Sequence, residues 1–228
     1  MAHSAALPCG RLLSRADNMS RPLAADRPLI KPRGLSATAA ARFGYYYADC
    51  ETGAFFASVD GLKFANIPNL SFPQSHRCVL EPHPTERGGG LWLALGSNGL
   101  HFVADANVPG ATFRAAVGIA AAHTVAVGAP PTSGAEPSVY IFGLRDSQVQ
   151  GEGGEAGAED LHVLASLDRA ATFTDVRSSN GKGLGNWPEV LVASRARFGV
   201  LAVGSFGRGA FFVNASAVLF VNASAAVL

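Results

Sequence analysis

Short apolar runs separated by turn-forming residues dominate the chain from about residue 45 onward. The runs are rich in Val, Phe and Tyr and bounded by Gly, Pro, Asn and Asp, and none shows the spacing of an amphipathic helix. Such runs are typical of β-strands. We expect strands at 45–48, 54–59, 91–95, 100–104, 124–127, 139–142, 161–165, 200–203 and 211–213. Many short strands with turns between them predict an all-β sandwich, barrel or propeller.

Two stretches between these runs read as surface loops. Residues 129–137 (APPTSGAEP) combine Pro, Gly and Ser, and residues 150–160 (QGEGGEAGAED) are rich in Gly and acidic residues. The second stretch lacks the alternating oxygen ligands and fixed Gly turn of a calcium loop. We therefore expect a solvated acidic loop there.

Three segments repeat one form: a short strand, a small residue, an Asp, and a turn that ends in an aromatic residue. The clearest is Ser166-Leu167-Asp168-Arg169-Ala170-Ala171-Thr172-Phe173. The second runs from Ser58 through Asp60 and Gly61 to Phe64, and the third from Val103 through Asp105 and Gly110 to Phe113. The closing aromatics lie 49 and 60 residues apart, which suits propeller blades of four short strands.

The repeat has a structural rationale. An Asp at the head of a tight hairpin can accept hydrogen bonds from the backbone N–H groups of the turn. A Gly tolerates the turn backbone, and the aromatic can pack between neighbouring sheets. We therefore interpret Asp60, Asp105 and Asp168 as structural residues and not as catalytic ones.

At about 45 to 60 residues per blade, the chain accommodates three to four blades. We predict an all-β, partial β-propeller of four-stranded antiparallel blades over residues 41–213. An irregular segment is expected at 1–40 and an apolar tail with a duplicated VNASA at 214–228. Because an open arc exposes apolar sheet faces, we expect the arc either to be prone to association or to need the missing blades from another chain.

Composition excludes several classes. The 228 residues are 48% hydrophobic and 15% charged with a net charge of +1, so a nucleic-acid partner is not expected. Cys9, Cys50 and Cys78 are too few and too scattered for a disulfide scaffold, and no two form a CxxC pair. The spacing of His76, Cys78 and His83 fits no zinc site, so no metal or other cofactor is predicted.

The termini leave localisation open. Residues 1–33 are basic and lack the apolar core of a secretory signal, so they resemble either an organelle transit peptide or an irregular terminus, the simpler reading. The last nineteen residues carry no charge, but their Asn and Ser residues argue against a membrane anchor. Sequons at Asn18, Asn69, Asn214 and Asn222 agree with secretion.

The repeat resembles the Asp-box, S-x-D-x-G-x-T-[FW], of sialidases, sortilin-type receptors and certain β-glucanases, with Ala171 where Gly is usual. The flanking segments resemble segments of glycoside hydrolase family 74, and between residues 23 and 213 they occur in the same order as in that family. The matching segments are RFGYYY (42–47) with GAFFASVDG (53–61), LWLA (91–94) with GLHF (99–102), VYIFG (139–143) and RFGVLAVGSFGRG (197–209).

The resemblance implies an activity that this chain is not expected to complete. Family members are xyloglucan-cleaving endo-β-1,4-glucanases of two seven-bladed propellers, in which one aspartate from each propeller carries out inverting hydrolysis in the cleft between them. The matched region is the end of the second propeller, so neither catalytic aspartate maps here. The resemblance also implies an extracellular protein and a β-glucan partner; the alternative is a non-catalytic scaffold module, sortilin-like or like a photosystem-assembly factor.

Trp187 is the candidate substrate contact, because sugar rings stack on exposed aromatic faces; the alternative is a Trp wedged between blades. Arg208, between two glycines, either presents its guanidinium outward or simply closes a hairpin. No catalytic pair is assigned from the carboxylates near expected strand ends, which are Asp49, Glu51, Asp146, Asp175 and Glu189.

Overall fold

A computed structural model describes residues 36–41, 44–84, 90–146, 161–176, 188–205 and 209–216. Within these ranges the regular elements are strands, β1 to β15, arranged in four antiparallel sheets. This agrees with the all-β prediction.

Each sheet is a meander of consecutive strands, which we call blades 1 to 4. Blade 1 comprises β1 (Ser36–Ala41), β2 (Gly44–Asp49), β3 (Ala54–Ser58) and β4 (Ala65–Ser71). Blade 2 comprises β5 (Val79–Pro82), β6 (Leu91–Ala94), β7 (Leu100–Val103) and β8 (Arg114–Ala115). Blade 3 comprises β9 (Ile119–Gly128), β10 (Ser138–Arg145), β11 (His162–Ser166) and β12 (Thr174–Asp175). Blade 4 has three described strands, β13 (Pro188–Ala193), β14 (Val200–Ser205) and β15 (Gly209–Asn214).

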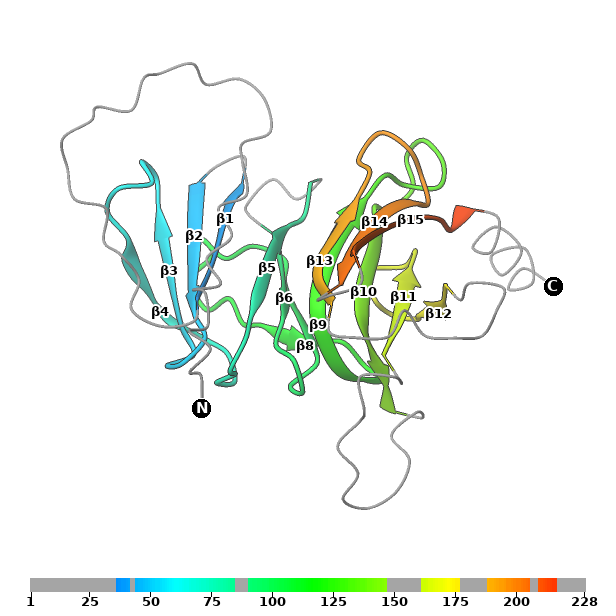
Figure 1. Cartoon of the computed structure of the whole chain (residues 1–228). Helices are drawn as coiled ribbons and strands as arrows, with labels where there is room; N and C mark the ends of the chain where they lie inside the picture. The colour runs from blue at the N-terminus through cyan, green and yellow to red at the C-terminus, as the bar shows by residue number, and fades with distance from the viewer. Residues whose placement is uncertain are drawn as a thin grey trace, which may run out of the picture.

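The blades follow one another around an arc. The first strand of each blade contacts the first strand of the next, so that β1 lies beside β5, β5 beside β9 and β9 beside β13. Figure 1 shows blades 1, 2 and 3 in chain order from left to right, with blade 4 overlapping blade 3 in this view. First strands that neighbour one another, with later strands further out, are the radial repetition of a β-propeller.

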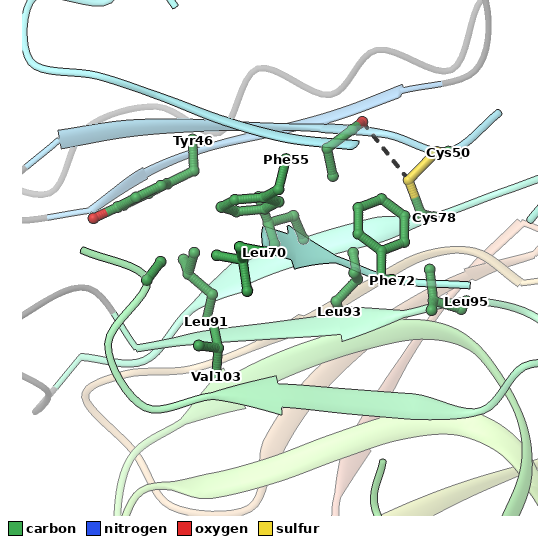
Figure 2. Close-up of a cluster of buried hydrophobic side chains, with 13 residues drawn as sticks. Tyr46, Cys50, Phe55, Leu70, Phe72, Cys78, Leu91, Leu93, Leu95 and Val103 are labelled. Atoms are coloured by element: carbon green, nitrogen blue, oxygen red, sulfur yellow. Dashed lines mark hydrogen bonds between the residues drawn. A yellow bond between two sulfur atoms is a disulfide. The ribbon is translucent and has the colours of Figure 1, made fainter. Parts of the chain in front are cut away.

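Residues two apart on a strand point to the same face, and each inner blade is apolar on both faces. Tyr46 and Phe55 of blade 1 pack against Leu91 and Leu93 of blade 2 in one buried cluster (Figure 2). The alternate residues of the same β6 strand, Trp92 and Ala94, pack on blade 3.

The third cluster joins blades 3 and 4. Tyr140 and Phe142 of β10 pack against Leu201 and Val203 of β14, while Val139 and Ile141 of the same β10 face blade 2. The described residues therefore form three interblade cores in series.

The structure corrects the sequence analysis in two places. Strand β1 lies partly inside the segment 1–40 that we expected to be irregular, so the first blade begins before residue 41. Cys50 and Cys78 form a disulfide that links blade 1 to the segment before β5, a bond that cysteine number and spacing did not indicate. Of the tail 214–228, only residues 214–216 are described.

Candidate functional site

The turn after β3 is organised by Asp60. Its Oδ1 accepts hydrogen bonds from the backbone N–H groups of Leu62 at 2.8 Å and Lys63 at 3.0 Å, and from the Ser58 hydroxyl at 2.9 Å. The bond from Lys63, followed by those from Leu62 and Ser58, lowers the pKa of Asp60 to about 2. Gly61 occupies the left-handed region with a φ of 72°, as a tight turn requires.

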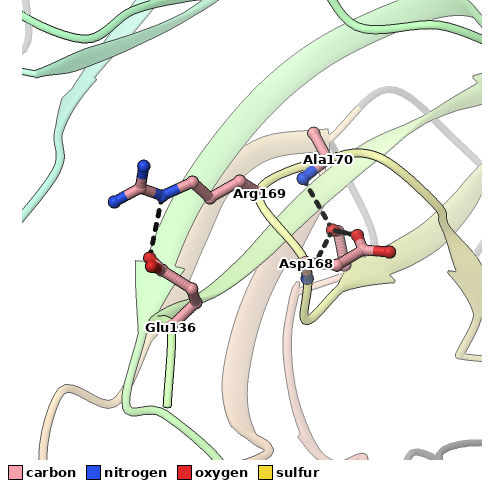
Figure 3. Close-up of polar contacts among 5 residues, drawn as sticks. Glu136, Asp168, Arg169 and Ala170 are labelled. Carbon is pink, nitrogen blue, oxygen red and sulfur yellow. Dashed lines mark hydrogen bonds and ion pairs between the residues drawn. The ribbon is translucent and has the colours of Figure 1, made fainter. Parts of the chain in front are cut away.

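The turn after β11 repeats this arrangement around Asp168 (Figure 3). Asp168 accepts bonds from the Ser166 hydroxyl at 2.7 Å, the Thr172 N–H at 2.9 Å and the Thr172 hydroxyl at 2.6 Å. Burial raises the pKa of Asp168, but these hydrogen bonds outweigh burial and hold the pKa below its usual value. The left-handed residues here are Arg169 and Ala170, with φ of 56° and 64°.

Asp105 holds the looser third turn. It accepts one bond, from the Asn107 N–H at 2.9 Å. The Asn107 side chain donates in turn to the phenol oxygen of Tyr46 at 2.7 Å, which ties this turn of blade 2 to blade 1.

Two of the three closing aromatics, Phe113 and Phe173, fill the space between blades. The ring of Phe113 in blade 2 lies 5.3 Å from that of Phe55 in blade 1, and Phe173 of blade 3 packs on the cluster shared with blade 2. Phe64 of blade 1 lies 6.2 Å from Tyr47, on the face turned away from blade 2. Each closing aromatic thus lies on the face toward a preceding blade or, in blade 1, on the corresponding end face.

An open hollow of about 320 Å³ lies in blade 3, between the β8–β9 turn, the end of β10 and the residue before β12. Its lining combines an apolar wall with one cation and one carboxylate: Val117, Gly118, Ile119, Arg145, Asp146 and Phe173. Arg145 donates to the carbonyl of Phe173 at 2.6 Å, which fixes the guanidinium against this wall. Asp146 is exposed. We take this hollow as a candidate ligand site.

A group of charges lies where the first strands of blades 2 to 4 end. Arg195 pairs with Glu81 at 3.1 Å, and Arg169 pairs with Glu136 at 2.9 Å. His83, in the same region, is buried; burial, followed by the positive charge of Arg169, lowers its pKa to about 4. The first pair joins blade 4 to blade 2, and the second links two loops of blade 3, so both have a structural explanation.

The remaining candidate carboxylates do not form a pair that faces a common hollow in the part of the chain that the structure describes. Asp49 accepts from the N–H of Glu51 at 3.1 Å and organises its own turn. The Oδ2 atom of Asp175 lies 3.5 Å from Nδ1 of His162. Asp146 lines the hollow described above, and the side chain of Glu189 lies outside the described residues.

Several predicted residues fall outside the description or have a different role. Trp187, Arg208 and the acidic loop 150–160 lie outside the described residues. Cys78, weighed as a metal ligand, is bonded to Cys50. No helix among the described residues is long and apolar enough to span a membrane.

The four antiparallel blades form part of a β-propeller, and two crystal structures show the same fold. One is the GH74 enzyme of Niastella koreensis, at 20% identity and a TM-score of 0.56 over 78% of this chain and 24% of that one. The other is the GH74 xyloglucanase from Xanthomonas campestris, at 18% identity and a TM-score of 0.58 over 79% of this chain and 24% of that one. The chain therefore spans about a quarter of each.

Neither a protein-family model nor a curated protein matches the sequence. The expected resemblance to glycoside hydrolase family 74 is thus found in the fold, and at this level of identity it shows the fold alone.

Proposed function

We propose that this chain is a glycan-contacting fragment, equivalent to blades of the second propeller of a xyloglucan-specific, inverting endo-β-1,4-glucanase. The observation that carries the proposal is the match to part of two GH74 structures, one of them a xyloglucanase, over 78% and 79% of the chain. The proposed role is to bind β-glucan without cleaving it.

The hollow in blade 3 has the chemistry that a sugar ring needs. Phe173 and Val117 offer apolar surface to the C–H groups of the ring, and Arg145 and Asp146 offer a donor and an acceptor to its hydroxyls. Its volume of about 320 Å³ lies near the lower end of the roughly 300–1,000 Å³ of small-molecule sites. Trp187, which lies outside the described residues, is proposed as a second stacking surface; the alternative that the sequence leaves open is a Trp wedged between blades.

Hydrolysis needs more than this site offers. An inverting enzyme places an acid and a base carboxyl about 6.5–9.5 Å apart, with a water between them. Of the described residues that line the hollow, Asp146 is the one carboxylate. Asp60, Asp105 and Asp168 are occupied by turn donors. The chemistry requires no metal or organic cofactor.

A secreted protein is the setting that we propose, with an organelle as the alternative. The Cys50–Cys78 disulfide requires an oxidising compartment. Asn69, the first residue of a sequon, is exposed on the outermost strand β4, where a glycan can be accommodated.

Retardation of the purified chain in native gels that contain xyloglucan tests the proposal. We expect retardation in xyloglucan, none in dextran, and no release of reducing ends. Asp146→Ala should weaken retardation at least about fivefold, since it removes the acceptor of the hollow. Glu51→Ala, an exposed residue of the β2–β3 turn, is the matched control.

Equal mobility in all gels would refute glycan binding. It would favour the alternative, a non-catalytic scaffold module whose aspartate turns serve packing alone. Release of reducing ends by the chain would instead indicate a catalytic pair that includes residues that the structure does not describe.

A further inference from the structure

The outer face of blade 4 is an uncharged sheet surface. Val192, Ala202 and Phe212 are paired across its three strands and form one row. Val192 is 44% and Phe212 85% exposed. The next row on this face consists of Val190, Gly204 and Ala210, so the described part of the face carries no charged side chain.

The opposite end of the arc presents aromatic residues. Tyr45 and Tyr47 of β2 point away from blade 2, since Tyr46 between them lies in the core shared with that blade. Phe56 and Phe64 lie beside Tyr47, with ring centroids 5.5 and 6.2 Å from it. Tyr45 is 40% exposed.

This aromatic end corresponds to faces that are interfaces elsewhere in the molecule. The equivalent residues of the second strand are Leu91 and Leu93 in blade 2, which pack on blade 1, and Val139 and Ile141 in blade 3, which pack on blade 2. The end face of blade 1 therefore continues a series of established interfaces.

At each internal interface, aromatic residues of one blade pack against aliphatic residues from the second strand of the next blade. Tyr46 and Phe55 meet Leu91 and Leu93; Trp92 and Phe102 meet Val139 and Ile141; Tyr140 and Phe142 meet Leu201 and Val203. At the two end faces the aromatic and aliphatic sides are exchanged: blade 1 presents Tyr45 and Tyr47, and blade 4 presents a surface that is aliphatic apart from Phe212, so an aromatic surface again meets a mainly aliphatic one. Two blade 1 faces would instead place aromatic against aromatic.

We propose that a second copy of this chain docks head to tail, with the blade 4 face (Val192, Ala202, Phe212) on the blade 1 face (Tyr45, Tyr47, Phe56, Phe64) of its partner. Applied twice, the contact joins two arcs of four blades into one closed ring. Heterologous contacts that close generate rings, and eight blades lie within the range of about four to eight seen in propellers. The inference rests on the fold and is independent of glycan binding.

Size-exclusion chromatography with light scattering on the full chain is the first test. We expect a dimer at micromolar concentration. Phe212→Lys and Tyr45→Lys should each give monomers, a loss of at least about tenfold in affinity, because a charge on an apolar contact is left unpaired. Val117→Lys, which alters an equally exposed apolar residue in a turn of blade 3, is the matched control and should remain dimeric.

Mixing the two monomeric variants distinguishes head-to-tail from face-to-face pairing. A Tyr45→Lys copy retains an intact blade 4 face, and a Phe212→Lys copy retains an intact blade 1 face. Head-to-tail docking therefore predicts that the mixture, unlike either variant alone, forms a heterodimer through one intact interface. Circular dichroism and thermal melting on each variant separate loss of association from loss of folding.

Three results would overturn the proposal. A monomeric wild-type chain would show that other residues of the chain, or further blades, cover the two faces. A Phe212→Lys variant that folds and remains dimeric would place the interface elsewhere. A mixture that stays monomeric, or a ladder of larger species in the wild type, would exclude the closed head-to-tail ring.

Discussion

Cys50 and Cys78 are joined by a disulfide at one end of the interface between blades 1 and 2, with their Cα atoms 5.7 Å apart. At the other end of the same interface, Asn107 donates to the phenol oxygen of Tyr46 at 2.7 Å. Figure 2 shows the aromatic and leucine side chains packed between Tyr46 and the disulfide. The first two blades are therefore fastened at both ends of their shared core.

Removal of the disulfide by the double change Cys50→Ser, Cys78→Ser should lower the free energy of unfolding by about 3–4 kcal/mol, since the bond closes a loop of 28 residues in the unfolded chain. Urea denaturation measures the effect, and reduction of the wild type should reproduce it. Cys9→Ser, which removes the third thiol, is the control. A double variant as stable as the wild type would contradict the role given to the bond.

Loss of the Tyr46 hydroxyl should lower the stability of the fold even though the aromatic ring remains. Tyr46→Phe removes one partly buried hydrogen bond from Asn107 and should destabilise the chain by about 1 kcal/mol. Tyr45→Phe, on the exposed side of the same strand, should change stability by less than about 0.5 kcal/mol. Thermal denaturation compares the two, and equal effects would show that Asn107 does not stabilise the interface.

The turns around Asp168 and Asp105 should lose different amounts of stability when the aspartate is replaced. Asp168 accepts three hydrogen bonds and Asp105 accepts one. Asp168→Ala should therefore cost about 1–2 kcal/mol of stability and Asp105→Ala about 0.5–1 kcal/mol. Denaturation midpoints measure both, and the reverse order would mean that the turn bonds are not what these carboxylates contribute.

Stability should fall between pH 6.5 and 4 because of His83. Burial, followed by the charges of Arg169 and Arg195 and against that of Glu136, brings its pKa to about 4 in the folded chain, from an ordinary value of 6.5. In this range the unfolded chain binds a proton that the folded chain does not, so unfolding becomes easier as the pH falls, by about 2–3 kcal/mol in all.

His83→Phe retains the contact with Trp92 and Phe102 and should remove that part of the pH dependence. Part of the pH dependence of stability that remains in this variant comes from His101 and His123, whose pKa values burial also lowers. Urea midpoints at pH 7.5 and 5 provide the measurement. The exposed His76→Phe should keep the wild-type difference, and a His83→Phe variant that does the same would disprove the assignment.

Most strands rich in strong β-formers were predicted, with β13 (Pro188–Ala193) as an exception, whereas β1 and β4 were not predicted. The runs at 45–48, 91–95 and 139–142 correspond to β2, β6 and β10. Strand β4 contains Pro68 and two Asn residues, and β1 is mostly Ala, so local preference argues against both. Both lie at the edges of blade 1, and pairing with β2 and β3 makes them strands.

The hollow and the disulfide were not predictable from one sequence. Val117, Arg145 and Phe173 come together because the β8–β9 turn, the end of β10 and the segment before β12 meet in space. Cys50 and Cys78 carry no spacing signal, since they are brought together by the packing of one blade on the next.

The order of apolar runs and turns in the sequence determined the meandering blades and the aspartate turns, because alternation along a strand and hydrogen bonds within a turn are local effects. Only the tertiary structure decided which faces meet. Whether Tyr45 or Tyr46 lies in a core depends on where the neighbouring blade packs. The residues next to Tyr46 in the chain do not indicate its contact with Asn107, which is 61 positions away.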